Sequence, residues 1–254
     1  MQLNVFFTPI EIVNAEAHTN DIYIVIDVIR ATTTIPVMFD QGAARVLVAE
    51  TIEQAREAAQ KLPGRFLCGE RNVKPLPGFD YGNSPYQFSQ VDLTGSEMIL
   101  TTTNGTRAFY ACPEHAIRLA GSFYNAHAVV SHTLKLAQER NSNIALVCSG
   151  ELGYFALDDA TCAGYLALEL QQLAAEHFKE LSLHLHESVY AATALYHAYK
   201  PPKILEYCES AQSVFQAGLV EDPHFCMQTS KSMSIAMVIG REEETGLLVL
   251  EKVK

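Results

Sequence analysis

The sequence predicts an α/β fold, a three-layer α/β/α sandwich with a mixed sheet. The run 22–28 is apolar, rich in β-branched residues and short, as in strands buried on both faces of a parallel sheet. Similar runs alternate with helix-like segments as far as residue 177, which is typical of parallel sheets covered by helices. Two β-like runs at 234–239 and 247–253 predict a closing hairpin and therefore a mixed sheet. We see no linker and expect one domain over residues 1–254.

Local signals place the elements along the chain. Thr51 followed three residues later by Gln54 predicts a capping box and a helix that begins at residue 52. Gly42 is suited to end the preceding helix, because glycine accepts the left-handed conformation found there. Strands are expected at 3–7, 22–28, 45–50, 65–68, 97–102, 116–121 and 143–148. Helices are expected within 8–20 and at 34–41, 52–62, 124–140 and 159–177, with a mostly helical stretch at 181–230.

Residues 72–85 are dense in Pro, Gly and Asn and are expected to form a long loop. Loops of this length inside a compact domain are usually functional or disordered, and the aromatic residues and prolines here favour order. Asn83 or Ser84 before Pro85 predicts the cap and first residue of a short helix.

Composition and charge narrow the classes of partner. The chain has 254 residues, 48% of them hydrophobic, and a net charge of −11, which argues against nucleic acid or an anionic membrane as the main partner. No run has the length of a membrane span, and the N-terminal segment does not resemble a signal peptide. Six cysteines without metal-type spacing predict free, mostly buried thiols in a reducing cytoplasm. An acidic protein that handles a small anion needs arginines, helix termini or a divalent cation nearby.

Polar clusters follow several predicted strands. Asp27 ends the run 22–28, and Arg30 and the threonines from Thr32 come next, at the start of a predicted helix where anions bind. The alternative is a capping acid that pairs with Arg30 to support the fold. Carboxylates without a histidine or thiol set favour Mg²⁺ over zinc. The other clusters are Gly69-Glu70-Arg71, Thr101 to Arg107, Cys148-Ser149-Gly150 and Asp158-Asp159.

A series of five motifs resembles the 2-phosphosulfolactate phosphatase family. The motifs occur in the family's order over residues 22 to about 164, and the C-terminal third matches less sharply. One departure is Asp158, where the family pattern has Glu, so Asp159 is the better candidate for metal contact. The motifs are Asp27-Val28-Ile29-Arg30-Ala31-Thr32-Thr33-Thr34, Gly69-Glu70-Arg71, Gly82-Asn83-Ser84-Pro85, Thr102-Thr103-Asn104-Gly105-Thr106 and Leu157-Asp158-Asp159.

The resemblance implies an α/β/α phosphatase that uses Mg²⁺ to hydrolyse (2R)-2-phospho-3-sulfolactate to 3-sulfolactate in coenzyme M biosynthesis. It implies a metal site of Asp27, Glu70 and Asp159, and Arg30 with these acids as the catalytic group. The expected contacts to the small anionic substrate come from Arg71, Thr32, Asn83, Asn104, Gly105, Thr106 and Ser149.

Several alternatives stay open at the level of sequence. One alternative is a nucleophilic water activated by a carboxylate. The other is Asp27 as a covalent nucleophile, although position 29 is Ile where the haloacid-dehalogenase pattern has a second Asp. Cys148 is a weak candidate nucleophile, and His184 with His186 a weak candidate metal pair. The substrate is alternatively another phosphorylated hydroxy acid, or the chain is a non-catalytic anion-binding module. An apolar helix at 159–175 and the C-terminal hairpin lead us to expect a homodimer.

Overall fold

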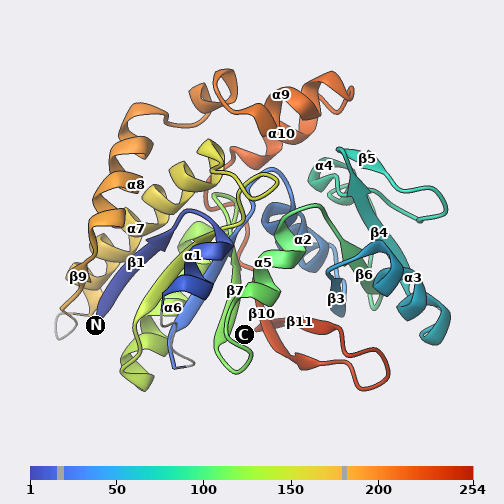
Figure 1. Cartoon of the computed structure of the whole chain (residues 1–254), viewed down its shortest axis with the longest axis horizontal. Coiled ribbons are helices and arrows are strands. Elements are labelled where there is room, and N and C mark those ends of the chain that lie inside the picture. The colour runs from blue at the N-terminus through green and yellow to red at the C-terminus, as the bar shows by residue number, and fades with distance from the viewer. Residues whose placement is uncertain (16–19, 179–181, 254) are drawn as a thin grey trace.

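The computed structural model describes residues 1–15, 20–178 and 182–253, within which eleven strands form one sheet with helices on both faces (Figure 1). The strands are β1 (Gln2–Phe6), β2 (Ile22–Ile26), β3 (Arg45–Ala49), β4 (Phe66–Arg71), β5 (Lys74–Pro75), β6 (Glu97–Thr101), β7 (Ile117–Gly121), β8 (Ile144–Cys148), β9 (His184–Leu185), β10 (Ile235–Arg241) and β11 (Leu248–Val253). The helices are α1 (Pro9–Asn14), α2 (Ala31–Asp40), α3 (Ile52–Lys61), α4 (Pro85–Phe88), α5 (Gly105–Ala111), α6 (Ala126–Arg140), α7 (Leu157–His177), α8 (Glu187–Ala198), the 3₁₀ helix η1 (Lys203–Glu206), α9 (Glu209–Gln216) and α10 (Glu221–Cys226).

The sheet is mixed, as predicted. Its order is β5-β4-β6-β3-β11-β10-β7-β2-β8-β1-β9. Strands β2, β7, β8, β1 and β9 pair in parallel, as do β3, β6 and β4, and the antiparallel hairpin β10–β11 separates these two groups. Strand β10 is antiparallel to β7, with Met237 opposite Leu119, and so joins the hairpin to the larger parallel group.

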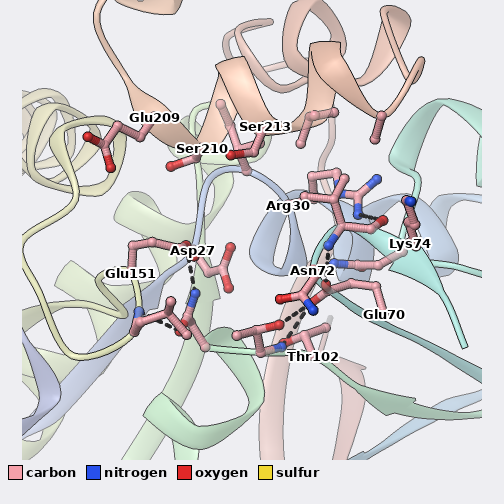
Figure 2. A pocket seen from close by; sticks show the side chains of 18 of the residues that line it. Asp27, Arg30, Glu70, Asn72, Lys74, Thr102, Glu151, Glu209, Ser210 and Ser213 are labelled. Carbon is pink, nitrogen blue, oxygen red and sulfur yellow. Dashed lines mark hydrogen bonds between the residues drawn. The ribbon is translucent and has the colours of Figure 1, made fainter.

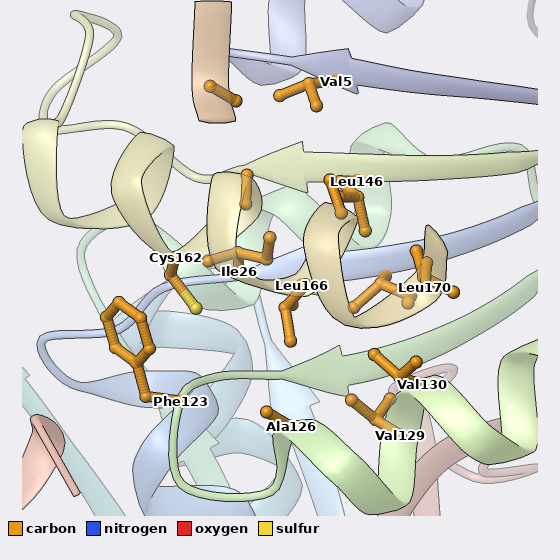
Figure 3. Packing of buried hydrophobic residues seen from close by; sticks show 14 of the residues in the cluster. Val5, Ile26, Phe123, Ala126, Val129, Val130, Leu146, Cys162, Leu166 and Leu170 are labelled. Atoms are coloured by element: carbon orange, nitrogen blue, oxygen red, sulfur yellow. The ribbon is translucent and has the colours of Figure 1, made fainter. Parts of the chain in front are cut away.

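Alternation along β2 divides the core into two layers. Ile24 and Ile26 face α6 and α7, whereas Tyr23 and Val25 face α2 and α5 on the other side of the sheet. Figure 3 shows α7 pressed against β2 and α6 through small and branched side chains. A fully buried side chain of this size contributes about 1.5–3 kcal/mol. The three-layer sandwich predicted from the sequence is confirmed.

The capping signals are confirmed by the structure. Thr51 accepts from the backbone N–H of Gln54, whose side chain accepts in return from Thr51. Ser84 is the cap of α4 with Pro85 as its first residue, and Gly42 has a left-handed φ of +92°.

Several boundaries differ from the prediction. Helix α2 begins at Ala31, so the threonines lie in its first turn, where the Thr33 hydroxyl donates to Val28 O and the Thr34 hydroxyl to Arg30 O. Strand β4 continues to Arg71 and forms a hairpin with β5, inside the segment predicted to be a loop. Strand β9 lies within the segment 181–230 that was predicted to be mostly helical, and parts of the predicted helical segments 8–20 and 181–230 lie outside the described residues.

Helix α7 does not supply the apolar surface on which the expected homodimer depended. Its apolar residues are buried in the core against the sheet, α6 and α8. The homodimer stays a prediction without that support. None of the helices in the described ranges has the length and apolarity needed to cross a bilayer.

Candidate functional site

A cavity of about 510 Å³ opens at the edge of the sheet where the parallel strands end (Figure 2). Parallel strands deliver their carboxyl ends to one edge, and open α/β sheets bind ligands in the crevice outside it. Helix α9 contributes the side of the cavity that faces this edge. The charged side chains that line it are Asp27, Arg30, Glu70, Lys74, Glu151 and Glu209.

The loop after β6 reaches the end of β2 at Gly105. A Cβ at this position would collide with Asp27 Oδ2 and Ala31 Cβ, so the close approach requires glycine. The preceding residue, Asn104, holds the loop after β8. Its Nδ2 donates to Glu151 Oε2 at 2.8 Å, and its Oδ1 accepts from the Leu152 N–H at 3.0 Å. Loops from strands that are distant in the sheet therefore meet at the cavity.

Asp27 directly follows β2 and is 8% exposed. Its Oδ1 accepts from the Ala31 N–H at 3.2 Å, and no described residue donates to Oδ2. Burial raises the pKa of Asp27 to about 7 against the effect of the Ala31 N–H, and the carboxylates of Asp158, Glu70 and Glu151 raise it further. A buried acid with a raised pKa in a cavity is typical of a functional group.

Two buried acids in the first turn of α7, Asp158 and Asp159, interact electrostatically with Asp27. Asp159 accepts from the backbone N–H groups of Val28 (2.9 Å) and Gly150 (3.0 Å), which ties the loops after β2 and β8 together. Burial raises its pKa well above the usual range, and neighbouring carboxylates add to this. Asp158 accepts from the Ser210 hydroxyl on α9 at 3.1 Å, and burial raises its pKa to about 6.

Glu70 and Glu151 complete the group of acids. Glu70 accepts from the Thr103 N–H (2.8 Å) and hydroxyl through Oε1, and from the Val73 N–H (3.0 Å) through Oε2. Burial raises the pKa of Glu151, and the charges of Asp158 and Glu70 contribute. Ionising Asp27, Asp158, Asp159 and Glu151 together is unfavourable unless a cation lies among them.

The three predicted metal ligands, Asp27, Glu70 and Asp159, are all buried at this edge, but they do not form a closed cage. In the part of the chain that the structure describes, no three His, Cys, Asp or Glu side chains are arranged to hold a metal ion. Mg²⁺ commonly keeps several waters and takes one or two carboxylates plus a substrate phosphate. The uncommitted Oδ2 of Asp27 and the raised pKa of its neighbours fit such a hydrated ion.

Arg30 lines the cavity and is also part of a buried ion pair. Its Nη1 donates to Asp222 Oδ2 at 2.8 Å, and its Nη2 donates to Val73 O at 2.9 Å. The Ser84 hydroxyl donates to the same Asp222. Of the two roles that the sequence left open for Arg30, the supporting ion pair is therefore present. The guanidinium still has N–H groups without an assigned partner, which leaves the anion contact available.

Arg71, expected to bind the anion, is instead held against the sheet. Its Nη1 donates to Glu70 O at 2.6 Å and its Nη2 to Thr101 Oγ1 at 3.1 Å, and burial lowers its pKa. Arg71 is not among the residues that line the cavity.

The remaining predicted contacts divide into two groups. Asn83 and Asn104 line the cavity. Thr32, Thr106 and Ser149 do not: the Thr32 hydroxyl donates to Gly121 O, Thr106 exchanges hydrogen bonds with Thr102, and the Ser149 hydroxyl is buried without a partner among the described residues. These three residues shape the loops around the cavity, and Gly105 brings two of the loops together.

The weaker sequence candidates have structural roles. Cys148 is fully buried, and burial raises its pKa well above the usual range, which makes it a poor nucleophile. His186 accepts from the Ser188 N–H at the start of α8, and His184 lies on β9 at the edge of the sheet.

Sequence reasoning missed four residues at the site. Glu151 directly follows the Cys148-Ser149-Gly150 cluster, so its position after a strand was a usable signal. Lys74 stands inside a segment predicted to be a loop, and Ser210 and Asp222 come from the C-terminal third of the chain. No local pattern links these three to the strand ends.

The fold and the site define the chain as a three-layer α/β/α protein with a polar cavity, lined by acids and cations, at the edge of its sheet. The chain belongs to the 2-phosphosulfolactate phosphatase family, whose family model ("2-phosphosulpholactate phosphatase") matches residues 7–240. The recognition made from the motifs is thereby confirmed.

Relatives with the printed name "Probable 2-phosphosulfolactate phosphatase" support this membership. One from Carboxydothermus hydrogenoformans is 33% identical over 251 residues, 99% of this chain and 98% of that protein. One from Parasynechococcus marenigrum is 33% identical over 252 residues, 98% and 99% of the two chains. One from Deinococcus radiodurans is 41% identical over 153 residues, 60% of this chain and 62% of that protein.

Proposed function

We propose that the chain is a Mg²⁺-dependent phosphatase that hydrolyses (2R)-2-phospho-3-sulfolactate to (2R)-3-sulfolactate and phosphate, as a step of coenzyme M biosynthesis. The observation that carries this proposal is Asp27: a buried carboxylate at a strand end, with one oxygen uncommitted, on a cavity that also presents Arg30 and Lys74. Family membership supplies the reaction and the substrate class.

Asp27 would hold Mg²⁺ through Oδ2, and Glu151 would reach it directly or through water. When bound, the ion would polarise a phosphoryl oxygen and offset the negative charge of the acids. Asp27 and Glu151 lie on the same side of the cavity in Figure 2. Asp159 supports this side through the Val28 and Gly150 N–H groups, whereas Glu70 fixes the Thr103 and Val73 N–H groups on the Arg30 side.

The chain's own residues would then position the ester and move the proton. Arg30 is fixed by Asp222 and Val73 and presents its remaining N–H groups to the anion without further reorganisation. A carboxylate of the cavity that does not bind the ion directly would take a proton from an attacking water, and Glu151, whose pKa burial raises, lines the cavity and suits this role where it reaches the ion through water. Covalent attack by Asp27 is the alternative route.

Phosphate release from 4-nitrophenyl phosphate by the purified chain tests this proposal. We expect release that requires Mg²⁺, is abolished by EDTA and returns when excess Mg²⁺ is added. We also expect Mg²⁺ to raise Tm, because binding to the folded state alone stabilises it and relieves repulsion among the acids. Equal release with and without EDTA would contradict the metal requirement. Absence of release from both this ester and 2-phospho-3-sulfolactate would favour the non-catalytic anion-binding alternative.

A further inference from the structure

A strained turn stands on the cavity wall beside Arg30. Asn72 and Val73 join β4 to β5 with φ values of +51° and +71°, as in the two-residue turns of tight hairpins. Such values are uncommon outside glycine, and they are unfavourable for a β-branched residue such as Val73. A strained backbone persists only where its surroundings hold it, and it is often found at ligand sites.

Two buried charged side chains hold this turn from either side. Glu70 Oε2 accepts from the Val73 N–H at 3.0 Å, and Arg30 Nη2 donates to Val73 O at 2.9 Å. The next residue, Lys74, is thereby fixed at the cavity. In Figure 2 Arg30, Asn72 and Lys74 lie on one side, away from Glu151.

Lys74 is the cation of this cavity that lacks a compensating carboxylate. The charge of Arg30 is neutralised by Asp222, whereas the Lys74 ammonium makes no hydrogen bond or ion pair with any described residue. Asp27 and Glu151 lie on the opposite side, and Glu70, on the Lys74 side, already accepts from the Thr103 and Val73 N–H groups. This separation of charge suits a small ligand with one anionic group near the acids, where a divalent cation would bridge it, and a second anionic group near Lys74.

An unpartnered buried amide lies close to Arg30. Asn83 is 3% exposed, lines the cavity, and its Oδ1 has no hydrogen-bond partner among the described residues. Its neighbour Ser84 donates to the same Asp222 that pairs with Arg30. Buried amides normally have a partner, and a half-turn of this group exchanges its acceptor for a donor. A ligand that enters the cavity would supply the missing hydrogen-bond partner of the Asn83 amide.

We propose that Lys74, together with Asn83 and the remaining N–H groups of Arg30, binds the second acid group of the substrate, its sulfonate or carboxylate, and that Lys74 sets the preference for phosphate esters that carry such a group. This inference rests on the proposed function, because it places the phosphate of the proposed substrate near the acids and its other acid group near Lys74. Arg71 was expected to bind the anion, but its guanidinium donates to Glu70 O and Thr101 Oγ1 and does not line the cavity. Lys74 is the residue available for this contact.

Calorimetric titration with 3-sulfolactate tests the subsite without catalysis. This probe carries both acid groups and no phosphate. We expect Lys74→Gln to raise its Kd about tenfold and Lys74→Arg to restore most of the affinity, since one charge-assisted contact is lost and regained. Lys135→Gln on α6 removes an exposed lysine that does not line the cavity and is expected to keep the parent Kd. A Kd for Lys74→Gln within twofold of the parent, or no binding to the parent, overturns the proposal.

Kinetics separate a failure of the subsite from a failure of the proposed function. The measured quantity is the ratio of kcat/KM for 2-phospho-3-sulfolactate to kcat/KM for 4-nitrophenyl phosphate, which has no second acid group. We expect this ratio to fall about tenfold in Lys74→Gln and to stay at the parent value in Lys135→Gln. An unchanged ratio in an active enzyme overturns the subsite alone. If the parent hydrolyses neither ester, the proposed function fails, and the titration still decides whether Lys74 binds the acid.

Discussion

Asp27→Asn is expected to lower kcat/KM about a thousandfold, or roughly 4 kcal/mol of transition-state stabilisation. The amide can still accept from the Ala31 N–H, so the shape of the loop is kept. It cannot carry the charge that would hold Mg²⁺ at Oδ2. The measurement is kcat/KM for 2-phospho-3-sulfolactate, with Tm recorded on the same preparation.

The same variant should not lose stability at neutral pH. The pKa of Asp27 is raised from 3.8 to about 7 in the folded protein, so its contribution to stability is complete below the unfolded value and is lost as pH rises through the folded value. Asparagine does not ionise, so the Asp27→Asn protein does not lose this stability as pH rises. Asp92→Asn, at an exposed acid that does not line the cavity, is the control and is expected to keep the parent kcat/KM. An Asp27→Asn enzyme with activity within threefold of the parent would contradict the role of Asp27.

Asp222→Ala is expected to lower the free energy of unfolding by about 3–5 kcal/mol, because it leaves the Arg30 charge buried without its partner. For a chain of this size the loss corresponds to a Tm decrease of roughly 6–20 °C. Glu114→Ala is the control, since its ion pair with Arg241 is exposed and should contribute far less to stability than the buried pair. Urea unfolding of both variants gives the two free energies of unfolding. Equal decreases would show that the buried ion pair contributes no more to stability than the exposed one.

Arg30→Lys separates the supporting role of this residue from its catalytic role. Lysine keeps a cation opposite Asp222, so the expected loss of stability is smaller than in Asp222→Ala. A single ammonium does not reproduce the fork that holds both Asp222 and Val73 O and still presents N–H groups to the anion. We expect kcat/KM to fall at least about tenfold. A lower Tm with near-normal kcat/KM would restrict Arg30 to support of the fold.

The fold was largely predictable because its strongest elements are local. Strand β2 is an uninterrupted apolar run, and the boundaries near Thr51 and Ser84 follow from capping hydrogen bonds made within three residues. Strand β5 was not predictable, because its turn places Val73 in a conformation that valine avoids. The contacts that hold this turn come from Arg30 as well as from Glu70.

The candidate site was predictable where it coincides with strand ends. Asp27 and Glu70 come from strand ends and lie at the cavity as expected. The partner of Arg30 was hidden, because Asp222 is 192 residues away in the sequence. Asp159 shows a different limit: the motif located it, but the sequence could not show that both its oxygens bind backbone N–H groups.

Phosphate release from (2R)-2-phospho-3-sulfolactate by the purified chain tests the central claim most directly. With Mg²⁺ present we predict a kcat/KM of about 10⁴ M⁻¹s⁻¹ or more, in the range of enzymes acting on their own substrates, and equal amounts of phosphate and 3-sulfolactate. With EDTA, or in Asp27→Asn, the rate should fall at least about a hundredfold. Release that is absent, or that persists unchanged in EDTA and in Asp27→Asn, would contradict a Mg²⁺-dependent phosphatase site at this edge of the sheet.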